Sequence, residues 1–408
     1  MKYQMVRRTG HPDFLDLPWN QPLERWKTPR LVEIEAGLSR HVVRFVRYDE
    51  GIYALKELPK RLAEREYRLL SELARMSIPV VEAAGVVTDR AARPNTELDA
   101  ILITRHLDFS MPYRAVLASP GFVDLGNRLL DSLANLLVRL HIAGFYWGDC
   151  SLSNTLFRRD AGALAAYVVD VETGELHPTL SRGQRETDLM IAEENMAGEL
   201  LDMSAARRLP AGIDPDGTAA QLGERYGFLW SELTREEVIP SDRRYLIDDR
   251  LSRLNALGFD VDEVELVADG DGYRLRVQPH VVEPDHHART LQALTGLQVQ
   301  ENQARRILND LAQYRARLQG GRATRIPDAV VGYRWLNEVF EPTVQSIPPK
   351  LRGRLDPAEL YHELLEHRWF LSEAAGHDVG LDEAVRSFTE NVLSKVPEPA
   401  TEAPAPGS

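Results

Sequence analysis

Several features that mark other classes of protein are scarce in this chain of 408 residues. It has a single cysteine, Cys150, so no disulfide can form within the chain, and we expect a reducing compartment. No segment reaches the roughly 18 apolar residues of a membrane-spanning helix, and the first residues contain no apolar core of signal-peptide length. The sequence therefore predicts a cytoplasmic protein without a transmembrane segment, and a peripheral contact with a membrane stays open.

Positive charge is also scarce relative to negative charge. The formal net charge is −13 at pH 7, so we expect no general affinity for nucleic acid, although a local basic patch stays open. Hydrophobic residues make up 43% of the chain and charged residues 27%, which is typical of a globular protein. The length exceeds that of one ordinary hydrophobic core and predicts two or three domains.

The first hundred residues have the pattern of a small sheet with one inserted helix. Short β-type runs occupy 31–35, 41–48 and 51–58, and the turn "DEG" joins the last two. A helical pattern follows at 60–76, and two more strand-like runs come after it. Residues 1–30 contain several Pro and Trp without a period. We expect an irregular N-terminal extension at 1–30 and a sheet-rich lobe at 31–108.

The chain then becomes mainly helical. A leucine-rich helical pattern at 121–143 ends at Gly144, and the stretch "FYWGDCSLSN" leads from it into a predicted hairpin. Another helical pattern covers 183–203. We assign 109–208 to a second lobe and 209–395 to a separate, mainly helical domain with one β-hairpin around "DGDG". The Pro-rich tail at 396–408 is predicted to be disordered.

Five polar residues fall where phosphoryl transfer needs them. That reaction requires a cation on the phosphates of ATP, oxygen ligands for Mg²⁺ and a carboxylate that takes the proton of the acceptor hydroxyl. Lys56, in the apolar strand "YALKEL", is the candidate cation, and Glu66 in the next helix can pair with it. Asp149 is the candidate base. Asn154, five residues later, and Asp170, at the end of the predicted hairpin, are the candidate metal ligands.

Each of these residues also has an ordinary structural interpretation. Lys56 alone is typical of a surface lysine on a strand, and Glu66 competes with Glu64 as one of several helix charges. Asp149 and Asn154 alone are typical turn residues. What favours a shared site is their order along the chain, because each lies on the kind of element that the chemistry needs.

This order resembles the protein-kinase-like fold. "YALK" resembles the strand-three lysine motif, Glu66 resembles the helix-C glutamate, and "GDCSLSN" matches the D-x-x-x-x-N spacing of the catalytic loop. Asp170 stands where the metal-binding aspartate would be. The Gly-Asp start of the loop is closer to lipopolysaccharide core sugar kinases and aminoglycoside phosphotransferases than to protein kinases. The whole chain is similar to actinobacterial lipopolysaccharide-kinase-like proteins that carry an uncharacterised C-terminal domain.

The resemblance, which covers roughly 30–205, implies a two-lobed protein-kinase-like domain, and with the helical pattern that follows it we predict an α+β chain in which a mainly α-helical domain with one β-hairpin comes second. The resemblance implies ATP and Mg²⁺ as cofactors, with Gly37 and Ser39 of "AGLSR" on the phosphates. It also gives Asp188, in the helix after the catalytic loop, the structural task of anchoring that loop. The predicted function is phosphoryl transfer to a hydroxyl group.

The acceptor is predicted to be a small molecule, a sugar or a lipid-linked sugar. A protein kinase has a long peptide-binding segment after its metal-binding aspartate, and this segment ends in A-P-E. Here, residues 171–187 alone separate Asp170 from Asp188, and they contain no A-P-E. The short segment disfavours a peptide acceptor.

Departures from the motifs keep other functions open. Trp147 stands where His is common, and Ser151 stands where protein kinases have Lys and many small-molecule kinases have His. The phosphate loop has Gly37 as its one glycine. The main alternative is a pseudokinase that binds nucleotide or serves as a scaffold, with a partner on its C-terminal domain. A regulatory module without nucleotide, in which Lys56 lies far from Asp170, is a third interpretation.

Overall fold

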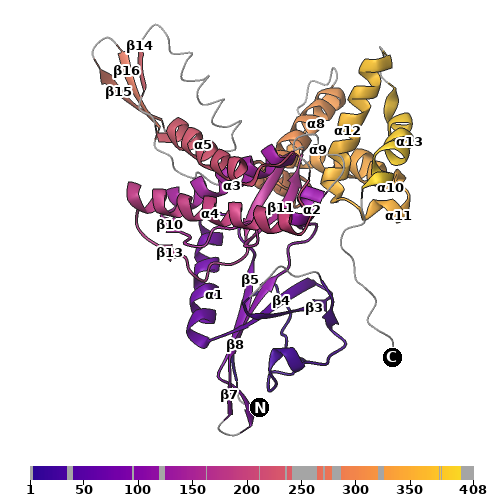
Figure 1. The fold of residues 1–408 in the computed structure, drawn as a ribbon. Coiled ribbons are helices and arrows are strands. Elements are labelled where there is room, and N and C mark those ends of the chain that lie inside the picture. Colours follow the sequence, from indigo (N-terminus) through magenta and orange to yellow (C-terminus); the bar gives the residue numbers. More distant parts are fainter. Residues whose placement is uncertain are drawn as a thin grey trace.

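The chain folds into a sheet-rich N-terminal part followed by a largely helical remainder, as the α+β prediction requires (Figure 1). The computed structural model describes residues 3–396, apart from 35–39, 94–95, 119–124, 162, 211, 235–236, 241–263, 270–271, 278–285, 320–325, 376 and 378. Gly37 and Ser39 therefore lie outside the described residues, and so does 243–260, where the sequence pattern predicts a helix.

A six-stranded antiparallel sheet forms the N-lobe, with strand order β1-β5-β8-β4-β3-β2. Its strands are β1 (Gln4–Arg7), β2 (Leu31–Val32), β3 (Val42–Tyr48), β4 (Gly51–Leu58), β5 (Ala83–Thr88) and β8 (Ala100–Arg105). The short pair β6 (Arg90–Arg93) and β7 (Thr96–Leu98) extends from it. Helix α1 (Lys60–Arg75) follows Pro59 and packs on one face of the sheet through Leu69, Leu70 and Leu73.

The N-terminal segment covers the other face of this sheet, which corrects the expectation of an irregular extension. Strand β1 pairs with β5, and a 3-10 turn at Leu23–Arg25 follows. Phe14, Trp19 and Trp26 are buried against Tyr53 and other side chains of the sheet. Gly85 permits the close approach of β1, since a Cβ there would lie 2.7 Å from the carbonyl oxygen of Val6. A short strand and scattered aromatic residues leave no periodic signal in the sequence, so sequence reasoning does not find β1 or the packing of this segment on the sheet.

Three long helices pack together after the sheet, and we call them, with the short elements around them, the C-lobe: α3 (Leu125–Ile142), α4 (Arg182–Ala205) and α5 (Pro215–Thr234), of which α5 lies beyond the predicted limit of 208. As the sequence predicts, α3 ends just before Gly144, which adopts φ +80°. Helix α5 carries no sequence prediction, yet its apolar residues join the core of α3 and α4. The remaining elements are α2 (Tyr113–Ala118), β9 (Met111–Pro112), β10 (Phe145–Tyr146), β11 (Thr155–Asp160), β12 (Ala163–Val168) and β13 (Glu175–Leu176).

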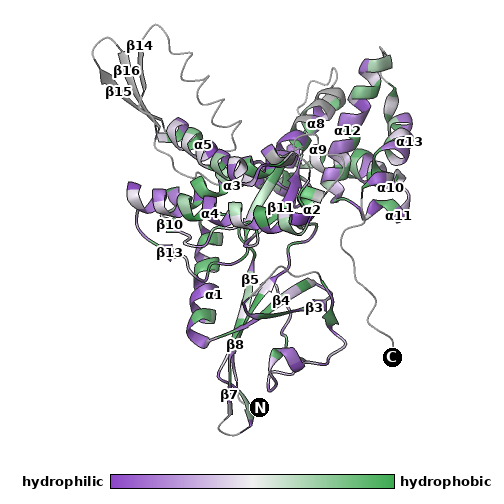
Figure 2. Cartoon of the chain, in the orientation of Figure 1, coloured by the Kyte–Doolittle hydropathy of each residue, from purple (hydrophilic) through white to green (hydrophobic). Residues whose placement is uncertain are grey.

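The two lobes meet at the β11–β12 hairpin. The backbone N–H of Val81 donates to the carbonyl of Val168 at 3.0 Å, and the N–H of Val168 donates to Pro79 at 3.0 Å. One apolar cluster continues from the α1 face of the sheet into α3 and β12. In Figure 2 the strands labelled β4 and β5 carry green segments, toward the hydrophobic end of the scale. The hairpin thus connects the sheet to the helices of the C-lobe.

A helical domain, which we define as residues 286–396, has an apolar core of its own. Trp335, Tyr361 and Phe388 are buried in its centre, separate from the core of the two lobes. Its elements are α7 (His286–Thr295), α8 (Glu301–Gln319), α9 (Asp328–Trp335), a π-helical turn (Leu336–Phe340), α10 (Glu341–Ser346), α11 (Pro349–Arg352), α12 (Pro357–Ala375), α13 (Gly380–Asn391) and a 3-10 turn (Leu393–Lys395).

The hairpin predicted around "DGDG" is confirmed as β15 (Val264–Asp269) paired with β16 (Gly272–Val277). A third strand, β14 (Glu237–Pro240), joins it by pairing with β16. Within the described ranges, none of the helices combines the length and the apolar character needed to cross a membrane.

The N-terminal segment should contribute strongly to stability. Trp19 is 1% exposed, and its indole N–H donates to the carbonyl of Phe14 at 2.8 Å. We expect Trp19→Ala to lower the free energy of unfolding by about 3 to 5 kcal/mol, because it leaves a large cavity. Leu15→Ala is the matched control, since Leu15 is 63% exposed, and it should cost less than about 0.5 kcal/mol. Equal denaturation midpoints for the two variants would contradict the packing role of this segment.

Candidate functional site

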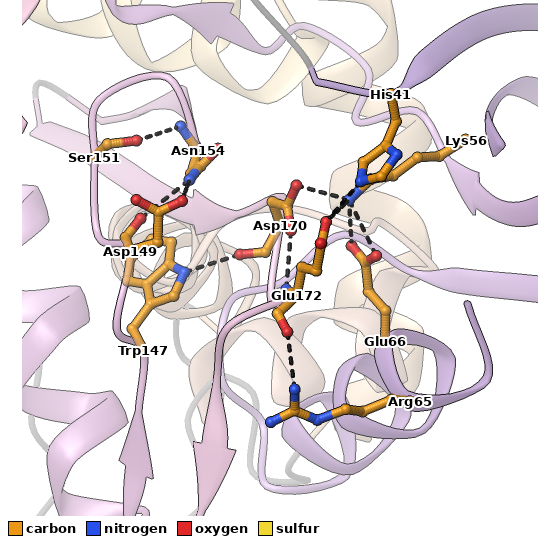
Figure 3. Close-up of polar contacts among 10 residues, drawn as sticks. All are labelled: His41, Lys56, Arg65, Glu66, Trp147, Asp149, Ser151, Asn154, Asp170 and Glu172. Atoms are coloured by element: carbon orange, nitrogen blue, oxygen red, sulfur yellow. Dashed lines mark hydrogen bonds and ion pairs between the residues drawn. The ribbon is translucent and has the colours of Figure 1, made fainter. Parts of the chain in front are cut away.

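The site begins with Lys56 on β4. Side chains alternate along a strand, so Lys56 faces α1 on the same side as Leu58, while Tyr53 and Leu55 face the N-terminal segment. Its Nζ lies 3.1 Å from Oε2 of Glu66 and 2.7 Å from Oδ2 of Asp170 (Figure 3). The ammonium group therefore links the N-lobe to the segment that follows β12. The regulatory interpretation, which requires Lys56 to lie far from Asp170, does not hold.

Burial controls the protonation of this pair. The Glu66 side chain is 1% exposed, and its burial, together with the nearby Asp170, raises its pKa to about 7 against the opposing effect of Lys56. Burial alone would lower the pKa of Lys56, but the carboxylates of Glu66 and Asp170 outweigh it and raise that pKa above its usual value. Lys56 therefore stays charged, as a phosphate-binding group must.

Asp170 starts a short turn that two neighbouring side chains brace. Its Oδ1 accepts the backbone N–H of Glu172 at 2.9 Å. The carboxylate of Glu172 lies 2.9 Å from Nε2 of His41 and 3.6 Å from Nζ of Lys56. Arg65 of α1 donates to the carbonyl of Glu172 at 3.1 Å. Glu172 thus reaches the beginning of β3, which follows the segment that contains Gly37 and Ser39.

Asp149 and Asn154 face each other across the loop between β10 and β11. The side-chain nitrogen of Asn154 donates to Oδ2 of Asp149 at 3.2 Å and to its carbonyl at 3.0 Å. This orientation leaves Oδ1 of Asn154 as the atom that can ligate a cation. The carbonyl of Asn154 accepts the N–H of Val169 at 3.0 Å, so Asn154 and Asp170 come from adjacent ends of one hairpin. In Figure 3, Asp149 and Asn154 lie on one side of Asp170, and Lys56 and Glu66 lie on the other.

Asp188 anchors the start of this loop, as the resemblance implies. It is fully buried on α4, and its carboxylate accepts the backbone N–H groups of Trp147 and Gly148, each at 2.7 Å. Nε2 of His141 lies 3.1 Å from the same carboxylate. Trp147, at the position where the motif often has His, is buried, and its indole donates to the carbonyl of Asp170 at 2.8 Å. It therefore ties the loop to the candidate metal-binding segment.

Ser151 makes hydrogen bonds within the loop through both its side chain and its backbone. Its Oγ accepts the N–H of Asn154 at 3.1 Å, and its carbonyl accepts the hydroxyl of Thr155 at 2.8 Å. The side chain is buried. Ser151 thus shapes the turn before β11, and a serine so engaged does not supply the charge that Lys or His carries at this position in related motifs.

Two residues of α4 support the loop, and sequence reasoning missed both. Asn195 donates to Oδ1 of Asp149 at 3.3 Å and to the carbonyl of Cys150 at 3.0 Å. Glu199 accepts the backbone N–H groups of Leu152 at 2.8 Å and Ser153 at 2.9 Å. A signal exists in the sequence, because these residues follow Asp188 at helical spacing and line one face of α4 with it.

The donor set fits magnesium bound with a nucleotide. Within the described residues, no three His, Cys, Asp or Glu side chains are grouped to hold a metal ion by themselves. Mg²⁺ does not require such a group, because it commonly binds one or two carboxylates together with substrate phosphates and water. One carboxylate on Asp170 and one amide oxygen on Asn154, with an ammonium group beside them, match that pattern.

Loss of the support from α4 should be measurable. We expect Glu199→Ala to lower the free energy of unfolding by about 2 kcal/mol, because the N–H groups of Leu152 and Ser153 lose their acceptor. Glu194→Ala is the matched control, an exposed glutamate on the same helix, and it should change stability by less than about 0.5 kcal/mol. Chemical denaturation of both variants tests this, and equal midpoints would contradict it.

Two family models match separate parts of the chain. Residues 47–199 match the lipopolysaccharide kinase (Kdo/WaaP) family, and residues 228–393 match a domain of unknown function, DUF4032. The first match contains Lys56, Glu66, Asp149, Asn154 and Asp170. No curated protein matches the chain significantly.

Among solved structures, one described as WaaP in complex with acyl carrier protein is similar. The alignment has 17% sequence identity and a TM-score of 0.32, and it covers 49% of this chain and 90% of that one. A likeness this distant supports no inference about activity. The two family matches are more informative, and by them the chain joins a part similar to the lipopolysaccharide kinase (Kdo/WaaP) family to a part similar to the DUF4032 family.

Proposed function

We propose that the protein is an ATP- and Mg²⁺-dependent phosphotransferase that acts on a hydroxyl group of a non-protein acceptor, which is a small molecule, a sugar or a lipid-linked sugar. The observation that carries the proposal is the contact of Lys56 with both Glu66 and Asp170, at 3.1 and 2.7 Å. A partly buried ammonium group at a hydrogen-bonded distance from two carboxylates, opposite an Asp–Asn pair, supports the cation, metal-ligand and base roles that phosphoryl transfer needs.

Each of the five residues has one role in this proposal. Lys56, held by Glu66, binds phosphate oxygens of ATP. Asp170 and Asn154 hold Mg²⁺, which when bound neutralises charge on the phosphates. Asp149 orients the acceptor hydroxyl and receives its proton as the oxygen bonds to the γ-phosphorus and the bond to ADP breaks. Gly37 and Ser39, outside the described residues, remain the proposed phosphate loop.

The segment after Asp170 supports a non-protein acceptor. Strand β13 within this segment pairs with β10 through Phe145–Leu176 and Tyr146–Glu175, and α4 begins soon afterwards at Arg182. This short, paired segment provides no platform for an extended peptide. The match to a lipopolysaccharide kinase family favours a sugar among the remaining acceptors.

A pseudokinase is the second candidate, and Ser151 favours it. Its hydroxyl is engaged by Asn154, so the charge that Lys or His supplies in related motifs has no substitute at this position. Such a protein either binds nucleotide without transferring phosphate or serves as a scaffold, with a partner on its C-terminal domain. A nucleotide-binding pseudokinase differs from the phosphotransferase in turnover and not in nucleotide binding.

Nucleotide binding is tested by thermal unfolding with and without Mg²⁺ and ATP. A ligand at 100 times its dissociation constant stabilises a protein by roughly 2.7 kcal/mol, so wild type should melt at a clearly higher temperature with both present. Asp170→Asn should lose the Mg²⁺-dependent part of this shift, because an amide is a weaker ligand for a hard cation. No shift in wild type at millimolar nucleotide would contradict the phosphotransferase and leave the scaffold form of the pseudokinase.

Transfer is tested with Asp149→Ala. Removing the base should lower the rate of phosphoryl transfer by about 10² to 10⁴-fold and leave the affinity for Mg²⁺ and nucleotide nearly unchanged. An acceptor screen with radiolabelled ATP measures the rate, and calorimetry measures binding. Loss of nucleotide binding in Asp149→Ala would instead give Asp149 a metal-binding or folding role.

A further inference from the structure

The helical domain contacts the C-lobe at the outer end of the β11–β12 hairpin. Helices α8 and α12 approach this end, and Figure 1 shows β11 beside α8. The two apolar cores on either side stay separate. The contact between them is instead made by a group of buried polar side chains that the proposed function does not use.

Asp160, the last residue of β11, caps helix α8 from outside that helix. Its Oδ1 accepts the backbone N–H of Gln303 at 2.9 Å, and its Oδ2 accepts the side-chain nitrogen of Asn302 at 3.0 Å and its backbone N–H at 3.3 Å. Asp160 is 5% exposed. A carboxylate at the first turn of a helix satisfies unpaired N–H groups and interacts favourably with the helix dipole.

Helix α12 holds the turn of the same hairpin. Glu359, which is 2% exposed, accepts the backbone N–H of Ala161 at 2.8 Å and the side-chain nitrogen of Gln303 at 2.7 Å. Gln303 also donates to the carbonyl of Arg159 at 3.2 Å. Both helices therefore bind the backbone of the hairpin tip through the buried pair Gln303 and Glu359.

Ion pairs complete the contact at its edge. Arg158 lies 3.1 Å from Asp356, and Arg159 lies 2.9 Å from Glu363. Asp356 also accepts the N–H of Ala358 at 2.8 Å, at the start of α12. Buried polar contacts have a defined geometry and lose much of their energy when they are misaligned. Such a contact fixes the hairpin in one position, whereas an apolar contact would tolerate sliding.

The inner end of this hairpin carries the two candidate metal ligands. Its strands pair without interruption from Asp160–Ala163 to Thr155–Val168. Asn154 directly precedes β11, and Asp170 comes two residues after β12. A displacement of the tip is therefore transmitted along the six residue pairs of the hairpin to Asn154 and Asp170 together.

We propose that Asp160 is a positioning residue through which the helical domain sets the spacing of Asn154 and Asp170 for a Mg²⁺–nucleotide complex. The inference rests on the proposed function and adds a task for the helical domain. It predicts that a change at Asp160 lowers the metal-dependent affinity for nucleotide and leaves the metal-free affinity unchanged. Metal-dependent nucleotide affinity depends on Asn154 and Asp170, whereas metal-free affinity depends on Lys56.

The test compares Asp160→Ala with Asp310→Ala in the full chain. Asp310 lies on α8, the helix that Asp160 caps, and its carboxylate accepts from Trp335 and Tyr361 inside the helical domain, at 2.7 Å each. The control thus removes a carboxylate from the capped helix itself without touching the hairpin. Calorimetry measures the dissociation constant of ATP with and without Mg²⁺, and thermal unfolding reports stability alongside.

Asp160→Ala should reduce the enhancement of ATP affinity by Mg²⁺ about five- to tenfold, in the range of coupling between distant sites. Its metal-free affinity should stay at the wild-type value, and Asp310→Ala should keep the full enhancement. Asp160→Asn retains one acceptor oxygen and should restore part of the effect. If Asp160→Ala does not fold, the same affinity measurements on Asp160→Asn test the inference.

Three results would overturn the inference, and each has a different meaning. If wild type shows the enhancement and both Asp160 variants retain it, the positioning role is wrong while the proposed function stands. If wild type binds no nucleotide with or without Mg²⁺, the proposed function fails and the inference fails with it. An equal loss in Asp160→Ala and Asp310→Ala would reduce Asp160 to a general stabilising residue.

Discussion

The ion pair between Lys56 and Asp170 is the interaction on which the site depends. It joins β4 to the end of the β11–β12 hairpin, and Glu66 and Glu172 add two more carboxylates around the same ammonium group. Three carboxylates thus surround one ammonium group, and the burial of Glu66 raises the cost of keeping them all charged. The raised pKa of Glu66 is one response to it. A divalent cation bound beside Asp170, as in the proposed function, would lower the repulsion among these carboxylates.

Support for this cluster comes from three directions. Helix α1 contributes Glu66 and Arg65. Helix α4 supports the loop before β11 through Asp188, Asn195 and Glu199. The helical domain binds the outer end of the β11–β12 hairpin. Each element binds backbone groups of the loops and not only side chains. A site held in this way keeps its geometry without a ligand, which lowers the reorganisation that a reaction would need.

Much of this arrangement is readable from the sequence, and the missing parts have physical reasons. The span of β4 and the end of α3 follow from period and from Gly144, and the "DGDG" hairpin follows from its turn chemistry. The proximity of Lys56, Glu66 and Asp170 follows from the resemblance. The contacts of Asp160 and Glu359 could not be predicted, because they join residues about 140 to 200 positions apart and leave no local pattern in the sequence. Strand β1 was missed for the same reason.

The limits of the domains stay predictions, and the packing of α5 on α3 and α4 favours a C-lobe that continues to residue 234.

The position of β1 has a consequence for the order of folding. Gln4 pairs with Thr88, and β5 reaches the rest of the sheet through β8, which ends at Arg105. During synthesis β1 therefore emerges long before its partner β5, and β5 can join the remaining strands only after β8 has left the ribosome. Domains generally fold as units as the chain is made, and pairings between distant segments form slowly. The N-lobe should thus assemble in one late step, with its aromatic N-terminal residues exposed to other chains until then.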